Sequence, residues 1–295
     1  MVIKQGHANF HYPAVWFPDT LAKAYKLKQE FLNDSCIIAG GTLLQTYWEK
    51  GVQCPKNLIS IENVKELQEY KLMKNNRQTF ILMGALTTLD CCKSKAIFLD
   101  NVPILVEAIR NIASPAIRNR ATIGGNIANG NGDVIPALLV LDASLILYDA
   151  HHLREIKLAE CIKDEKYLSN SILVNVKIPV QTKKSSENYF YKKIGLRESF
   201  CQSIVSISGY FKIGKKKIIE KVYLAVGGSS FLPQRLVDTE EIIKNLYLPS
   251  YQLKEIEQAI KKEFKPPSDH FTSSNYKQKI TTNIIVSEIT KIVSK

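Results

Sequence analysis

The chain has 295 residues, of which 45% are hydrophobic and 23% charged, and it carries a formal net charge of +12. This composition is typical of a soluble globular protein, and the length predicts two or three packed units. No run approaches the roughly 18 apolar residues of a membrane span, and residues 1–6 lack the apolar core of a signal sequence. The lysines are scattered, which argues against nucleic-acid binding. We therefore expect a cytoplasmic protein.

The cysteines and histidines predict no metal site. No two cysteines form a C-x-x-C pair and no histidine stands at metal-ligand spacing from them, so an iron–sulfur cluster held by this chain alone is not expected. The sequence also lacks a G-x-S-x-G motif, an H-E-x-x-H motif and a Cys/His nucleophile pair. No catalytic residue is predicted, and we expect a bound cofactor to carry the chemistry.

Helices and strands are predicted in alternation at the start of the chain, a βαβ-like rhythm. Hydrophobic periodicity and glycine stops place helices at 21–32 and 42–50 and strands at 36–39 and 57–61. In the middle of the chain we expect strands at 80–83, 143–148 and 172–178, helices at 86–92 and 103–112, and an apolar segment at 134–141.

The pattern of polar and apolar residues changes after about residue 180. A polar linker is expected at 181–188. The last part of the chain then predicts strands at 189–193, 204–213 and 218–226, followed by helices at 239–246, 253–264 and 275–293.

A glycine-rich turn follows the first predicted strand. The residues are Ile37-Ile38-Ala39-Gly40-Gly41-Thr42. Adjacent glycines let backbone N–H groups converge on an anion, and a helix N-terminus adds a favourable dipole. The turn is neither a G-x-G-x-x-G motif nor a Walker A loop, so an ordinary tight turn is the alternative.

A second glycine-rich segment extends from Asn119 to Asp133 and contains Thr122-Ile123-Gly124-Gly125-Asn126. Such a polar loop is suited to wrap a large polar cofactor, and Asp133 is a candidate acceptor for ribose hydroxyls or an amine. A flexible surface loop is the alternative.

Taken together, these segments resemble one family. The order Ala39-Gly40-Gly41-Thr42, then I-R-N-R-A-T-I-G-G-N-I-A-N at 117–129, then Asp133 and P-A-L-L at 136–139 is similar to the FAD-binding subunit of molybdenum hydroxylases, such as xanthine dehydrogenase and aerobic carbon monoxide dehydrogenase. Residues 10–32 and 191–197 resemble it too, so the likeness covers nearly the whole chain. The I-R-N-x-A-T-I-G-G-N segment is highly specific, whereas A-G-G-T alone is weak.

The resemblance implies an α+β fold. A two-subdomain FAD-binding unit of the PCMH/VAO-like type would be followed by a C-terminal antiparallel sheet with helices. The expected boundaries are 1–60 for the N-terminal α/β subdomain, 61–180 for the middle α+β subdomain and 181–295 for a C-terminal domain like that of carbon monoxide dehydrogenase flavoproteins. FAD would lie noncovalently between the first two, with the third closing over it.

The resemblance also implies the cofactor contacts. The residues expected to bind FAD are Ile37, Ile38, Ala39, Gly40, Gly41, Thr42, Leu43, Leu44, Ile112, Thr122, Ile123, Gly124, Gly125, Asn126, Asp133, Leu173 and Lys193. Simpler roles are open for three of them: Lys193 as an exposed charge, Leu173 as core and Asp133 as a helix N-cap.

The sequence departs from the family pattern at two places. Leu43 stands where the family often has Asp, a change that backbone-mediated phosphate binding should survive. Between Asn129 and Asp133 the chain has Gly130-Asn131-Gly132 in place of the longer A-S-P-x-x segment, so we expect a different loop geometry near the flavin.

The implied function is electron relay in a multi-subunit hydroxylase. A molybdopterin-binding large subunit would oxidise the substrate, and a small subunit with [2Fe-2S] clusters would pass electrons to FAD on this chain. FAD would then reduce NAD, oxygen or another acceptor. A xanthine or purine dehydrogenase, arranged as a dimer of heterotrimers, is the favoured enzyme. The alternative is a regulatory or scaffold nucleotide-binding subunit without electron transfer, and a self-sufficient flavin oxidase is disfavoured because no substrate-activating residue is present.

Overall fold

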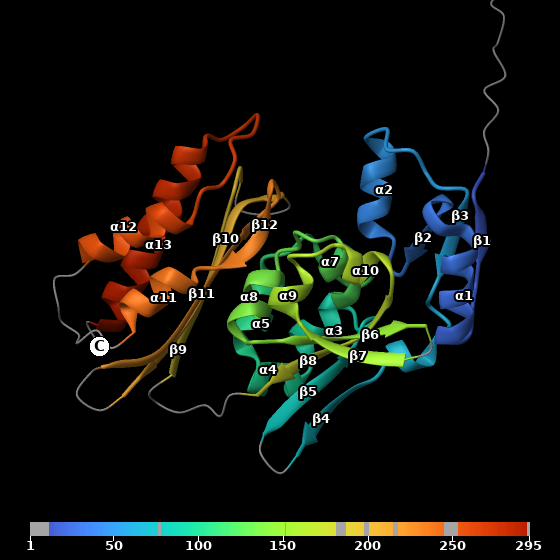
Figure 1. Cartoon of the computed structure of the whole chain (residues 1–295), viewed down its shortest axis with the longest axis horizontal. Helices are drawn as coiled ribbons and strands as arrows, with labels where there is room; N and C mark the ends of the chain where they lie inside the picture. Colours follow the sequence, from blue (N-terminus) through green and yellow to red (C-terminus); the bar gives the residue numbers. More distant parts are fainter. Residues whose placement is uncertain are drawn as a thin grey trace, which may run out of the picture.

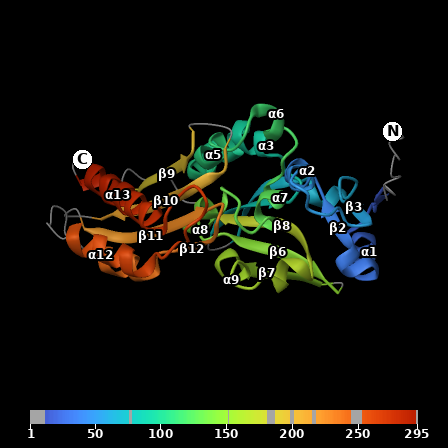
Figure 2. The ribbon, with the colours of Figure 1, turned by 90° about the horizontal axis from the view of Figure 1, so that it is seen from above.

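The computed structural model describes residues 12–75, 78–150, 152–180, 187–197, 201–214, 218–244 and 253–293. These residues form three sheets that follow one another along the long axis of the molecule, from the N-terminal part through the middle to the C-terminal part (Figures 1 and 2). The predicted mixture of helices and strands is confirmed. None of the helices in these ranges combines the length and apolar composition that a membrane crossing requires.

The N-terminal sheet is parallel, as the predicted βαβ rhythm requires. Its strand order is β1-β3-β2, and helices α1 and α2 connect the strands. Thr20 begins α1 as its N-cap and accepts a hydrogen bond from the Lys23 N–H. The elements are β1 (Ala14–Trp16), α1 (Leu21–Phe31), β2 (Ser35–Ile38), α2 (Thr42–Glu49) and β3 (Asn57–Ser60).

The middle sheet is antiparallel, with the order β4-β5-β8-β6-β7. Its strands are β4 (Tyr70–Lys74), β5 (Thr79–Gly84), β6 (Ser144–Asp149), β7 (His152–Lys157) and β8 (Ile172–Pro179). Short helices pack with it: α3 (Leu89–Ser94), α4 (Ala96–Asn101), α5 (Pro103–Arg110), α6 (Pro115–Arg118), α7 (Ile123–Ala128), α8 (Ile135–Val140), α9 (Leu158–Cys161) and α10 (Lys166–Ser169).

The C-terminal sheet is antiparallel with the order β9-β10-β11-β12, and three helices cover one of its faces (Figure 1). The strands are β9 (Glu187–Gly195), β10 (Ser203–Ile213), β11 (Ile219–Gly228) and β12 (Phe231–Arg235). The helices are α11 (Val237–Ile243), α12 (Leu253–Glu263) and α13 (Ser274–Val293). Most of the predicted linker, residues 181–186, lies outside the described residues.

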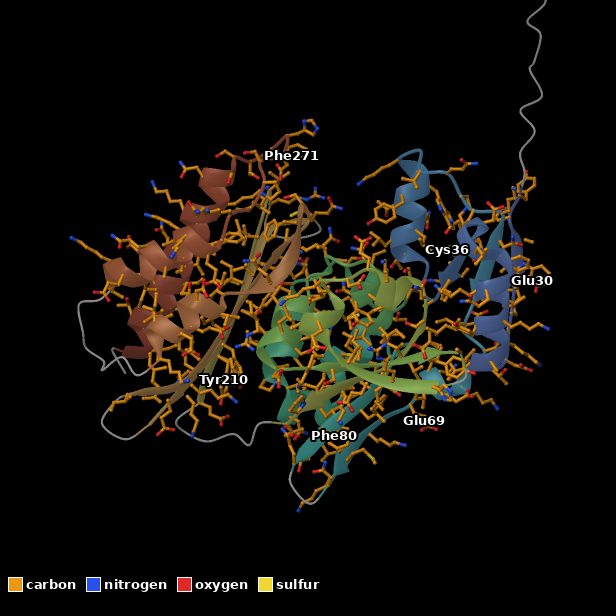
Figure 3. All side chains as sticks on the ribbon, viewed as in Figure 1. Glu30, Cys36, Glu69, Phe80, Tyr210 and Phe271 are labelled. Atoms are coloured by element: carbon orange, nitrogen blue, oxygen red, sulfur yellow. The ribbon has the colours of Figure 1, made fainter. Side chains whose placement is uncertain are left out.

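The two faces of the C-terminal sheet belong to different cores. Phe211, Phe264 and Ile285 pack in a core between the sheet and its own helices. Tyr191 and Tyr210 lie instead in the large core of the middle part; Tyr210 is labelled in Figure 3. Helix α8 contacts β10, β11 and β12 on that side. The C-terminal sheet is therefore packed directly against α8, the helix that follows the second glycine-rich segment.

Candidate functional site

All three parts of the chain contribute to one cavity of about 690 Å³, a volume within the range of ligand and cofactor sites. The N-terminal part supplies Lys28, Ile37, Ala39 and Ile61; the middle part supplies Ala85, residues 122–131 in part and an apolar wall from α9, α10 and β8; the C-terminal part supplies residues 229–232. An elongated ligand placed here touches every part of the chain.

The first glycine-rich turn leaves a helix N-terminus open. Gly41 begins α2 with a left-handed φ of +70°, and no side chain caps this end. No hydrogen bond within the described residues occupies the N–H groups of Thr42 and Leu43. A Cβ built on Gly41 would meet nothing within 4 Å. Free N–H groups at the positive end of a helix, beside open space, form an anion-binding position.

Ile123–Ala128 of the second glycine-rich segment form a helix, α7, so the interpretation of this part as a flexible surface loop is wrong. The Thr122 hydroxyl caps it by accepting from the Gly125 N–H at 3.1 Å. The N–H groups of Ile123 and Gly124 donate to the carbonyls of Thr87 and Ala85, each at 2.9 Å. Unlike the start of α2, the start of α7 therefore has its N–H groups already paired.

The structure brings six of the predicted cofactor contacts to the cavity wall: Ile37, Ala39, Thr122, Gly124, Gly125 and Leu173. Ile38, Gly40, Gly41, Thr42, Leu43 and Leu44 surround Ala39 on the same strand, turn and helix. Ile123 is fully buried beneath the wall, and Ile112 lies in the core at 9% exposure. The Asn126 side-chain oxygen accepts from the Val134 N–H at 3.3 Å, which fixes the loop before α8.

Asp133 and Lys193 form an ion pair, and neither is among the residues that line the cavity. Their charged atoms lie 2.8 Å apart, and their side chains are only 14% and 9% exposed. The Ser203 hydroxyl donates to Asp133 Oδ1 at 2.6 Å, and Lys193 Nζ donates to the Asn111 carbonyl at 3.1 Å. Lys193 is therefore not an exposed charge, and the Asp133 side chain does not cap α8. The pair joins the middle part to β9 and β10.

The short loop that departs from the family pattern forms a hydrogen-bonded strap, which the sequence did not reveal. Tyr47 Oη donates to Asn129 Oδ1 at 2.7 Å, Asn129 Nδ2 donates to Asn131 Oδ1, and Asn131 Nδ2 donates to the Ser229 carbonyl at 2.8 Å. The strap connects α2 with the turn between β11 and β12. The Asn-Gly-Asn-Gly sequence at 129–132 is the feature of the sequence that marks this loop.

A buried lysine anchors that turn from the other side. Lys277, on α13, is fully buried, and its Nζ donates to the Ser230 hydroxyl at 2.8 Å, the Pro267 carbonyl at 2.7 Å and Asp269 Oδ2 at 2.6 Å. The hydrogen bond from Lys277, with two backbone N–H donors, holds the pKa of Asp269 well below its usual value. The C-terminal wall of the cavity is thus fixed by polar contacts on both sides.

These features fit a dinucleotide cofactor such as FAD. The apolar wall of Leu158, Ile162, Leu168 and Ile172 suits a ring system. The open N-terminus of α2, next to Ala39 on the wall, suits a diphosphate. Gly130, like Gly41, has no atom within 4 Å of a Cβ position, so backbone can approach a ligand closely at both. Among the described residues no group of His, Cys, Asp and Glu is arranged to hold a metal ion.

Comparisons with known proteins agree with this site. Residues 8–181 match the family described as FAD binding domain in molybdopterin dehydrogenase. The glyceraldehyde dehydrogenase medium chain of Sulfolobus acidocaldarius is 28% identical over 248 residues, covering 82% of this chain and 85% of that protein. The putative xanthine dehydrogenase FAD-binding subunit of Escherichia coli K12 is 25% identical over 277 residues, covering 92% and 90%.

Solved structures share the fold over nearly the whole chain. The Cu,Mo-CO dehydrogenase structure matches with a TM-score of 0.85 at 19% identity, covering 96% of this chain and 98% of the matched chain. Quinoline 2-oxidoreductase from Pseudomonas putida 86 matches with a TM-score of 0.81 at 19% identity, covering 96% and 97%. The resemblance drawn from the sequence, the fold and FAD as the cofactor are thereby confirmed. The chain belongs to the family of FAD-binding domains of molybdopterin dehydrogenases.

Proposed function

We propose that this chain is the electron-transfer subunit of a molybdenum hydroxylase complex and receives electrons from an iron–sulfur subunit. The observation that carries the proposal is a cofactor-sized cavity that is bounded by all three parts of the chain. Bound FAD supplies reversible one- and two-electron redox chemistry. The protein residues bind and orient it.

The proposed FAD contacts fall into two groups, one that binds the diphosphate and one that packs against the rest of the cofactor. The turn from Ile37 to Leu44 offers free N–H groups to the diphosphate, while residues 122–126 and Leu173 shape the wall against which the rest of the cofactor packs. Asp133, Lys193 and Ile112 are not among the lining residues; Lys193 pairs with Asp133 and donates to the carbonyl of Asn111, which precedes Ile112. We propose the predicted boundaries 1–60, 61–180 and 181–295 as the three units that meet at the cofactor.

We propose partners from the names of the relatives. They are called medium chains or FAD subunits of dehydrogenases, which supports a small iron–sulfur subunit and a large molybdopterin-binding subunit beside this chain. Among substrates we propose a purine such as xanthine, supported by the relative named as a xanthine dehydrogenase subunit. Other relatives are named for glyceraldehyde, nicotinate and carbon monoxide. Steady-state oxidation of each of these by the complex tests the substrate.

Release of the flavin from the denatured protein tests the identity of the cofactor and whether it is bound noncovalently. Denaturation of the purified chain should free the flavin into the supernatant as FAD, because no side chain is predicted to bond it covalently. Flavin that stays with the precipitated protein contradicts noncovalent binding, and FMN in the supernatant contradicts a diphosphate site.

Electron relay is tested by anaerobic absorbance of the flavin band. The isolated chain should not bleach with a purine substrate, whereas the chain with its two partner subunits should. Bleaching of the isolated chain by substrate would make it a self-sufficient oxidase. Bleaching by dithionite, but not by substrate in the full complex, would favour the regulatory or scaffold alternative.

A further inference from the structure

A single ammonium group stands on the wall of the cavity. Lys28 lies in the last turn of α1, is half-buried, and lines the cavity together with Ile37 and Ala39. Among the described lining residues it is the one cation. The one carboxylate among them belongs to Glu165, which is exposed to solvent.

Nothing in the described part of the chain neutralises this ammonium. No carboxylate oxygen of the described residues lies within 4.0 Å of Lys28 Nζ. Burial lowers the pKa of Lys28, and the neighbouring Cys36 raises it by a smaller amount. Burial also raises the pKa of the Cys36 thiol above its ordinary value of 9.0, so at neutral pH this neighbour carries no charge. Cys36 is labelled on β2 in Figure 3.

A partly desolvated cation without a counter-charge is unfavourable until an anion arrives. In FAD the negative charge resides on the diphosphate, whereas the isoalloxazine, ribityl, ribose and adenine groups are neutral. The open N-terminus of α2 begins two residues after Ala39, which lines the cavity together with Lys28. Two sources of positive potential, one a full charge and one a helix end, are therefore available to an anion bound in this cavity.

We propose that Lys28 is the counter-charge of the cofactor's diphosphate. The proposal rests on FAD occupying this cavity. It assigns to α1, which none of the predicted contacts includes, a direct part in cofactor binding. The α2 N-terminus orients the diphosphate by hydrogen bonds, and Lys28 supplies the charge that those neutral N–H groups lack.

The test compares Lys28→Met with Lys26→Met on the full-length apo chain. Lys26 lies on the same helix but is exposed and does not line the cavity. The dissociation constant for FAD is measured by flavin fluorescence, and competition by ADP and by adenosine is measured in the same assay. We expect Lys28→Met to weaken FAD and ADP by about 10- to 100-fold, the size of a charge-assisted contact. Adenosine should compete unchanged, and Lys26→Met should behave as wild type.

Two further measurements separate a binding role from a structural one. The thermal unfolding midpoint of apo Lys28→Met should equal or exceed that of the wild type, because an unpaired, partly buried cation has been removed. Lys28→Arg should recover part of the FAD affinity. Salt should weaken FAD binding to the wild type more than to Lys28→Met, since the lost interaction is ionic.

Equal FAD affinity of Lys28→Met and the wild type would overturn the proposal. So would an equal loss for ADP and adenosine, which would place Lys28 at the adenine, or a large drop in the unfolding midpoint of the apo variant. Failure of the wild-type chain to bind FAD at all would instead overturn the proposed function, and the role of Lys28 with it.

Discussion

The carbonyl oxygen of Arg120 lies directly against Gly40, so that a Cβ at Gly40 would stand 1.9 Å from it. The Arg120 Nε donates in return to the Gly40 carbonyl at 3.5 Å. Two glycine-rich motifs that are 80 residues apart in the sequence therefore meet backbone to backbone. The contact brings the open end of α2 beside the cavity wall formed by α7.

Gly40→Ala should disrupt this contact. A methyl group cannot be accommodated against a backbone carbonyl without separating the turn from residues 120–121, so we expect a loss of about 2–3 kcal/mol in the free energy of unfolding. Gly41→Ala is the matched control: its Cβ would meet open space, and the cost is limited to the left-handed φ, roughly 1–2 kcal/mol. Urea unfolding of both apo variants measures the difference. Equal losses would contradict the packing role of Gly40.

Substitutions at two neighbouring glycines of α7, Gly124 and Gly125, should distinguish a structural role from a role in FAD binding. A Cβ on Gly124 would lie 2.7 Å from the Ala85 Cβ and carbonyl oxygen, whereas one on Gly125 would meet only the Thr122 hydroxyl at 3.1 Å. We therefore expect Gly124→Ala to lower the unfolding free energy by about 1–3 kcal/mol. Gly125→Val should weaken FAD binding far more than it affects the fold. If apo Gly125→Val loses most of its stability while its folded fraction binds FAD normally, Gly125 is structural.

Short-range sequence patterns were sufficient to predict helices and strands that are determined by capping and by apolar periodicity. Apolar periodicity located α1, α12 and β8, and Thr20 caps the start of α1. Strands β4 and β7 were missed because most of their residues are exposed on both faces, which leaves no apolar alternation to detect. Their pairing with β5 and β6 is a tertiary contact.

The candidate site was predictable only where a motif marks it. The segment that contains α7 was expected as a loop because it is rich in glycine and polar residues. In the structure the start of α7 is held by the Ala85 and Thr87 carbonyls from another segment. Lys28 carries no local signal at all: a lysine in the last turn of an amphipathic helix is usually a solvated charge. Only the packing of α1 against the rest of the cavity distinguishes it.

The ion pair between Asp133 and Lys193 should contribute to the stability of the fold because both side chains are largely buried. Lys193→Met leaves the Asp133 carboxylate desolvated, with Ser203 as its one remaining side-chain partner among the described residues. We expect a loss of about 3 kcal/mol in the unfolding free energy. The double variant Asp133→Asn, Lys193→Met should be more stable than the sum of the single losses predicts. Chemical denaturation of all four proteins gives the coupling. Strict additivity would mean that the two side chains act independently.

The asparagine strap should govern how long FAD stays bound. Asn131→Ala removes the hydrogen bond to the Ser229 carbonyl, and with it the link between α2 and the β11–β12 turn at the cavity. We expect FAD to dissociate several-fold faster, since one neutral hydrogen bond contributes about 1 kcal/mol. Asn63→Ala, at an exposed position, is the control. Stopped-flow displacement of FAD measures the rate, and an unchanged rate in Asn131→Ala would show that the strap does not retain the cofactor.

The contact between Asp269 and Lys277 should make stability depend on pH in the acid range. The folded state holds the pKa of Asp269 below the ordinary value of 3.8, mainly through the hydrogen bond from Lys277. A carboxyl group with a lowered folded pKa contributes stability at pH values above its unfolded pKa and loses it as the pH falls through the folded pKa. The unfolding free energies of the wild type and of Asp269→Asn should therefore differ by a constant amount from about pH 8 to pH 5 and converge below about pH 4.

The fully buried Lys277 makes this difference larger than an exposed pair would give, because Asp269→Asn leaves its ammonium without a counter-charge. Asp19, which pairs with Lys23 on the surface, has its pKa lowered in the same way, yet both side chains are well exposed. Asp19→Asn should thus change little at any pH. Since Lys277 also holds Ser230 at the cavity, Asp269→Asn should weaken FAD binding at neutral pH as well. A pH-independent difference between wild type and Asp269→Asn would show that the carboxylate charge is not what stabilises this corner of the fold.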